Sequence, residues 1–156
     1  MSEAPTRYRL LLADDHVVVL EGLQRLLTRP ELEIVSAVHD GQALVDLASA
    51  LKPDLIVADI SMPVLSGVEA AQRIRESDKR VKIIFLTMHA ELGYAVQAMR
   101  AGASGYVLKH AAGSELFRAI REVMDGGTYL PEQLREPVRR ALESTHRVDL
   151  GGGGED

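Results

Sequence analysis

Three acidic residues of this chain lie at the ends of short apolar runs, and these runs have the pattern of buried strands. Asp14 and Asp15 come directly after the run at 8–13, and Asp59 ends the run at 55–59. Adjacent carboxylates repel each other, so a nearby counter-charge best explains the pair. Carboxylate oxygens suit Mg²⁺, an ion that keeps several waters and is often completed by phosphate oxygens. The three acids therefore indicate a Mg²⁺ site that handles phosphate.

Two further apolar runs end in residues that could act on a phosphoryl group. The run at 82–87 ends in Thr87, and the run at 105–109 ends in Lys109. Asp59 could be a nucleophile that forms an acyl phosphate. Mg²⁺ and Lys109 would neutralise the phosphoryl charge, and Thr87 would donate a hydrogen bond to one of its oxygens. Taken singly, each residue also has a structural explanation, because Asp and Thr often cap helices and Lys often lies at a strand end.

The elements that must hold these residues follow from the hydrophobic periodicity. Five short runs are mostly apolar, as expected for parallel strands that are covered on both faces. They are residues 8–13, 33–38, 55–59, 82–87 and 105–109. Between them apolar residues recur at helical spacing, which predicts five helices. This strict alternation predicts an α/β fold, a doubly wound five-stranded parallel sheet flanked by five helices.

Local signals set some helix ends. The sequence from Ser66 to Glu69 has the pattern of a capping box, and Gly102 is a plausible helix stop. Pro131 could open a further helix near the C-terminus. In open α/β sheets ligands bind outside the carboxyl ends of the strands, so the acids, the hydroxyl and the ammonium are expected to converge at one edge of the sheet.

Composition excludes several classes of site and location. The 156 residues suffice for one domain with a core and a tail. The chain has no cysteine, which excludes disulfides, thiolate catalysis and Cys-ligated zinc. A net charge of −5 provides no general attraction to nucleic acid. We expect a cytoplasmic protein without membrane contact, because no apolar run approaches a membrane span and the N-terminus lacks the apolar core of a secretion signal.

Four short motifs occur in a recognisable order and spacing. They are "ADD" at 13–15, "DISMP" at 59–63, "LT" at 86–87 and "YVLK" at 106–109. Together they make the chain resemble the receiver domain of two-component response regulators, over about residues 7–127. The resemblance implies a flavodoxin-like fold with strand order 2-1-3-4-5.

The same resemblance implies a role for each site residue. Asp59 would accept a phosphoryl group from the phosphohistidine of a sensor histidine kinase. Asp15 and Asp59 would bind Mg²⁺, with Asp14 contributing mainly through water and the backbone carbonyl of Ser61 as a further ligand. Lys109 would be the lysine of the family's site.

A switch is also implied by the resemblance. Phosphorylation of Asp59 would draw Thr87 toward the phosphoryl oxygen, and Tyr106 would turn inward to fill the vacated space. The face formed by the fourth helix, the fifth strand and the fifth helix would then change shape, as a shift between two populated states.

Two longer stretches resemble the NarL/FixJ-type subfamily, whose members usually continue into a helix-turn-helix DNA-binding domain. They are "ADDHVVVLEGLQRLL" and "GGTYLPEQL". We expect residues 7–127 to form the receiver domain and 128–156 a linker helix and flexible tail, the start of a connection to a DNA-binding domain that the chain lacks. The alternative is a receiver with a short extension that works through protein contacts or phosphotransfer.

The expected partners are a sensor histidine kinase and, after phosphorylation, a second copy of the chain. DNA would be bound only through the missing output domain, so that the full-length protein would control transcription. The chain itself would catalyse only its own phosphorylation and slow dephosphorylation.

Other functions fit the sequence less well. A phosphatase with an aspartyl nucleophile would usually carry a second Asp two residues after the first, where this chain has Ser61. The complete acidic set argues against a phosphate-independent interaction module, and the acids after the first strand argue against an FMN binder. His16 and His89 flank the predicted site, but imidazole suits a Mg²⁺ site poorly, so we interpret them as loop or helix-start residues. By the resemblance, His89 could tune access of water.

Overall fold

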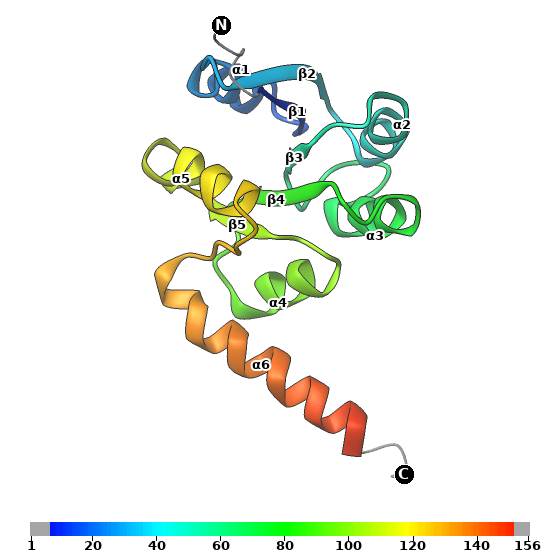
Figure 1. The fold of residues 1–156 in the computed structure, drawn as a ribbon, viewed down its shortest axis with the longest axis vertical. Helices are drawn as coiled ribbons and strands as arrows, with labels where there is room; N and C mark the ends of the chain where they lie inside the picture. The colour runs from blue at the N-terminus through cyan, green and yellow to red at the C-terminus, as the bar shows by residue number, and fades with distance from the viewer. Residues whose placement is uncertain (1–6, 152–156) are drawn as a thin grey trace, which may run out of the picture.

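The computed structural model describes residues 7–151, and the side chains of residues 7–144. Five parallel strands form one sheet in the order β2-β1-β3-β4-β5 (Figure 1). The strands are β1 (Tyr8–Ala13), β2 (Leu32–Val38), β3 (Leu55–Ala58), β4 (Lys82–Thr87) and β5 (Gly105–Leu108). The flavodoxin-like architecture and the expected strand order are confirmed. The predicted flexible tail at 152–156 lies outside the described residues.

Helices cover both faces of the sheet, which is why the inner strands are apolar on both sides. Helices α1 (Val17–Leu26) and α5 (Ala112–Met124) pack on one face. Helices α2 (Gly41–Leu51), α3 (Gly67–Ser77) and α4 (Leu92–Arg100) pack on the other (Figure 1). A short 3₁₀ helix, η1 (Lys109–Ala111), joins β5 to α5.

Two of the predicted local signals act as expected. The Ser66 hydroxyl accepts a hydrogen bond from the Glu69 amide, and the Glu69 carboxylate accepts one from the Ser66 amide. This capping box begins α3 one residue after the cap. Gly102 follows α4 with a φ of +102°, a left-handed conformation that favours glycine.

The chain beyond α5 is attached to the sheet and to α4. Tyr129 forms a bridge with Gly105, so its backbone lies along the outer edge of β5. The last described helix, α6 (Glu132–Gly151), follows Pro131 and runs past α4 (Figure 1). Leu134 and Val138 of α6 are buried in the same core cluster as α4. The division into a domain at 7–127 and a linker stays a prediction, but these contacts show that the segment after 127 packs against the sheet.

Candidate functional site

Asp14 and Asp59 lie side by side because their strands are hydrogen-bonded neighbours. In the parallel pair of β1 and β3, Ala13 is in register with Ala58. The Asp59 amide continues that ladder, donating to the Ala13 carbonyl at 3.0 Å. Both carboxylates are buried, with 1% of Asp14 and 5% of Asp59 exposed, whereas Asp15 is exposed. The structure thus places two negative groups together where water can hardly screen them.

Lys109 supplies the positive charge between the two buried acids. Its Nζ lies 2.9 Å from Asp14 Oδ2 and 3.1 Å from Asp59 Oδ2. Burial alone would lower the pKa of Lys109, but the contacts with Asp14 and Asp59 outweigh it and hold the pKa above its usual value. One ammonium therefore faces two carboxylates, and the pocket keeps an excess of negative charge.

A buried oxygen of Asp14 supports the idea of an additional cation. Within the described residues, Asp14 Oδ2 accepts no hydrogen bond of acceptable geometry, although it lies close to Lys109 Nζ. The Lys109 ammonium is shared with Asp59, so it compensates the desolvation of the two buried carboxylates only in part. Asp14, Asp15, His16 and Asp59 each offer a ligand atom, and these four atoms lie within 4.8 Å of one another. The donor set is rich in oxygen and fits a small hard cation such as Mg²⁺.

Ser61 belongs to the loop that shapes the pocket after β3. Its amide donates to Asp59 Oδ1 at 3.3 Å. The loop returns close to Asp59, since a Cβ on Gly67 would lie 2.1 Å from the Asp59 carbonyl oxygen. Glycine is therefore required where α3 begins. A metal contact through the Ser61 carbonyl stays a prediction.

The β3–α3 loop contains a strained residue. Val64 has a φ of 70°, and around it the Leu65 amide donates to the Pro63 carbonyl at 2.7 Å. A β-branched residue rarely adopts this conformation. The side chain of Val64 is 79% exposed, so packing of this side chain does not offset the strain.

Thr87 and Tyr106 are both fully buried beside the site. Thr87 Oγ1 accepts a hydrogen bond of 3.1 Å from the His89 amide. Burial raises the pKa of Tyr106, and its contact with the Thr87 hydroxyl lowers it only in part. The two predicted switch residues are thus neighbours. Tyr106 already has the inward position that the resemblance implies for the phosphorylated domain, so a turn of this side chain on phosphorylation stays a prediction.

The two histidines lie where the sequence indicated, His16 directly before α1 and His89 in the loop between β4 and α4. What the sequence did not predict is that His16 Nδ1 lies 3.1 Å from Asp14 Oδ1 and 3.3 Å from Asp15 Oδ1. Its place next to the acid pair was the signal available in the sequence. His89 stacks on Tyr94 with ring centroids 4.0 Å apart, a contact the sequence did not reveal.

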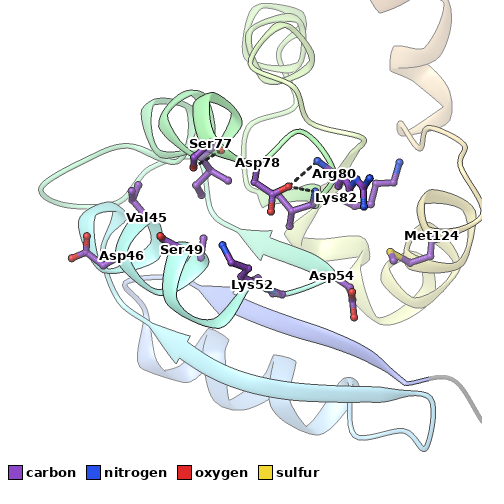
Figure 2. A pocket seen from close by; sticks show the side chains of 14 residues that line it. Val45, Asp46, Ser49, Lys52, Asp54, Ser77, Asp78, Arg80, Lys82 and Met124 are labelled. Atoms are coloured by element: carbon purple, nitrogen blue, oxygen red, sulfur yellow. Dashed lines mark hydrogen bonds between the residues drawn. The ribbon is translucent and has the colours of Figure 1, made fainter. Parts of the chain in front are cut away.

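A cleft of about 830 Å³ lies at the opposite edge of the sheet, by the amino ends of β3 and β4. Figure 2 shows its lining, which includes Lys52, Asp54 and Lys82. Asp78 Oδ1 accepts hydrogen bonds from the Arg80 and Val81 amides, so this carboxylate holds the local turn. None of the residues predicted for phosphoryl chemistry lines this cleft.

Comparison with known proteins identifies the family. The family model described as the response regulator receiver domain matches residues 10–121, so the chain belongs to the response regulator receiver domain family. The transcriptional regulatory protein DegU of Brevibacillus brevis is 35% identical over 125 residues, which cover 80% of this chain and 53% of DegU. The chain therefore spans about half the length of this relative.

Two solved structures are similar over most of this chain. The first is a two-component response regulator of the LuxR family from Aurantimonas sp. SI85-9A1, with a TM-score of 0.81 and 33% identity over 87% of this chain and 98% of that one. The second is the isolated REC domain of RcsB from Salmonella enterica serovar Typhimurium in the presence of phosphomimetic BeF₃⁻. It has a TM-score of 0.77 and 25% identity over 84% of this chain and 98% of that one.

These relatives are response regulators, and the chain is a receiver domain of the NarL/LuxR type. Among the helices of residues 7–151, none is both long and apolar enough to cross a membrane.

Proposed function

We propose that this receiver accepts a phosphoryl group on Asp59 in a site completed by Mg²⁺. The observation that carries the proposal is the position of Asp59, a buried carboxylate whose Oδ2 contacts Lys109 while Asp14 lies beside it. An incoming phosphoryl group brings further negative charge, and a pocket with one ammonium and two buried acids needs a second cation to hold it. The RcsB receiver structure with phosphomimetic BeF₃⁻ supports the same chemistry by similarity.

In the proposed transfer, an oxygen of Asp59 attacks the phosphorus of a phosphohistidine. The new O–P bond forms as the P–N bond breaks, and the donor imidazole keeps the bonding electron pair. Lys109 holds Asp59 in place and offsets charge on the phosphoryl oxygens, to one of which Thr87 would donate. Asp14, Asp15, Asp59 and the Ser61 carbonyl would hold Mg²⁺. When bound, the ion would neutralise negative charge on the phosphoryl group.

The proposed donor is a sensor histidine kinase, which would meet this protein in the cytoplasm. Several exposed apolar side chains lie on segments that follow the carboxyl ends of β1, β3 and β4, around Asp59. They are Val17, Val18, Val64 and Met88. Apolar residues at this edge suit docking of a protein donor.

The proposed output is transcription control by a longer protein, since DegU is a transcriptional regulatory protein. Phosphorylation would favour pairing of two copies of the receiver, and DNA would be bound by a separate output domain.

The proposal is tested by intact mass after incubation with acetyl phosphate and Mg²⁺, a small donor that needs no kinase. We expect a gain of one phosphoryl group in the wild type, and no gain in Asp59→Asn or in excess EDTA. Asp125→Asn, a substitution at an exposed aspartate, is the matched control and should gain one phosphoryl group as the wild type does. An equal adduct on Asp59→Asn would remove Asp59 as the acceptor, and full labelling in EDTA would remove the cation from the proposal.

A further inference from the structure

His16 lies at the mouth of the acidic pocket with its ring turned toward the acids. It stands one residue before α1, and its side chain, 61% exposed, makes no capping hydrogen bond within residues 7–144. The His16 amide donates to Asp14 Oδ1 at 2.9 Å, which fixes the backbone against the buried acid. The side chain is therefore held at the pocket by the fold, and the helix does not need it as a cap.

The imidazole and the Lys109 ammonium contact different oxygens of Asp14. Lys109 Nζ contacts Oδ2, whereas His16 Nδ1 lies 3.1 Å from Oδ1. The same nitrogen lies 3.3 Å from Asp15 Oδ1. His16 thus occupies the side of the acid cluster that Lys109 leaves open.

The spacing of the donor atoms approaches that of a coordination shell. One atom each from Asp14, Asp15, His16 and Asp59 lie within 4.8 Å of one another. Ligands on opposite sides of a small divalent ion, with bonds of about 2.1 Å, lie roughly 4.2 Å apart. Small side-chain adjustments would therefore bring the nitrogen and the carboxylate oxygens around one ion.

We propose that His16 is a nitrogen ligand of this site and that it raises the affinity of the site for first-row transition ions such as Co²⁺ relative to Mg²⁺. The inference rests on the proposed cation site and adds a donor to it. Imidazole suits transition metals, whereas Mg²⁺ prefers oxygen ligands. A site of three carboxylates and one imidazole should therefore discriminate between the two kinds of ion in a way that carboxylates alone would not.

Co²⁺ is the probe, because its visible absorption responds to the donor atoms and its affinity can be compared directly with that of Mg²⁺. Titrations use the tag-free full chain at one pH above the ordinary pKa of imidazole. We expect His16→Ala and His16→Gln to weaken Co²⁺ binding by about tenfold or more and to change the Co²⁺ spectrum. Mg²⁺ affinity should change by less than about threefold, since an oxygen-seeking ion gains little from the ring. His39→Ala, at another exposed histidine, is the matched control and should bind both ions as the wild type does.

Two outcomes separate this inference from the proposed function. If the His16 variants keep the wild-type ratio of Co²⁺ to Mg²⁺ affinity and the same Co²⁺ spectrum, His16 is not a ligand, and the cation site stands without it. If Asp15→Asn leaves binding of both ions unchanged, the cation site itself is wrong. Loss of both ions in Asp15→Asn, with selective loss of Co²⁺ in the His16 variants, supports the assignment.

Discussion

The hydroxyl of Tyr106 donates a hydrogen bond of 2.7 Å to the backbone carbonyl oxygen of His89. The backbone amide of His89 donates a hydrogen bond to Thr87 Oγ1. His89 is thus held on its two backbone polar groups by the two residues predicted to form the switch. A displacement of Thr87 toward a phosphoryl group on Asp59 would loosen the His89 amide and disturb the Tyr106 contact. The loop after β4 and the aromatic side chain on β5 are therefore coupled by hydrogen bonds.

This coupling predicts that Thr87→Ala still accepts phosphate on Asp59 but responds weakly to it. The substitution removes the hydroxyl that would reach the phosphoryl oxygen and leaves the nucleophile intact. Side-chain NMR signals of Tyr106 should change on phosphorylation in the wild type and much less in the variant. Tyr129, whose hydroxyl donates to Glu115, serves as the reference. If the wild type dimerises on phosphorylation but its Tyr106 signals do not change, the effect of phosphorylation does not pass through Thr87 and Tyr106.

The burial of Tyr106 also predicts how the free energy of unfolding changes at alkaline pH. Burial holds the pKa of Tyr106 above its usual value, so the unfolded chain loses the phenolic proton first, near pH 10. Above about pH 10 the unfolded state therefore binds fewer protons than the folded state, and the free energy of unfolding falls as pH rises.

Tyr106→Phe should show a shallower fall in stability above about pH 10, measured by denaturant unfolding. At neutral pH it should lose about 1 kcal/mol, because the hydrogen bond to His89 is gone. The raised pKa of Lys109 also makes stability fall at high pH. Because Lys109 is present in both proteins, this contribution is the same in each and does not affect the comparison. An identical alkaline limb in the variant would mean that the Tyr106 hydroxyl is not shielded in the folded state.

Lys109→Met should lower the free energy of unfolding by about 3 kcal/mol at neutral pH. The side chain is 14% exposed and faces Asp14 and Asp59, so its removal leaves two buried carboxylates without their ammonium. Mg²⁺ should then raise the melting temperature more in the variant than in the wild type, since the ion would replace part of the lost charge. Lys79→Met, at an exposed lysine, is the control. Equal gains from Mg²⁺ in both proteins would contradict the replacement of the lost charge by the ion, and no gain in either protein would contradict a cation bound to these acids.

Leu134→Ala should lower the free energy of unfolding by about 2–3 kcal/mol, because a side chain only 5% exposed leaves a cavity. Leu134 belongs to the core cluster that includes α4, so the loss tests whether the segment after 127 stabilises the receiver. Gln133→Ala changes the exposed neighbour and should have little effect. If Leu134→Ala unfolds like the wild type, α6 behaves as a linker with no part in the domain.

The sequence by itself was sufficient for the class of fold and the chemical types at the site. Alternating apolar runs and helical stripes define parallel strands and crossover helices, because side-chain periodicity and the handedness of crossovers are local properties of the chain. The same rules place Asp14, Asp59, Thr87 and Lys109 at one edge of the sheet. The capping box at Ser66 was readable for the same reason, since its partners are three residues apart.

The tertiary structure alone decided how those side chains meet. Lys109 contacts both Asp14 and Asp59, His16 turns its ring to the acids, and Tyr106 points inward to the His89 carbonyl. Leu134 packs in the core with α4, although the sequence indicated only a linker helix after Pro131. These contacts join residues from different elements, and their rotamers depend on packing, desolvation and charge summed over the whole neighbourhood. A pattern in the sequence can define which groups reach one edge, but the energy that selects among their contacts exists only once the strands and helices are assembled.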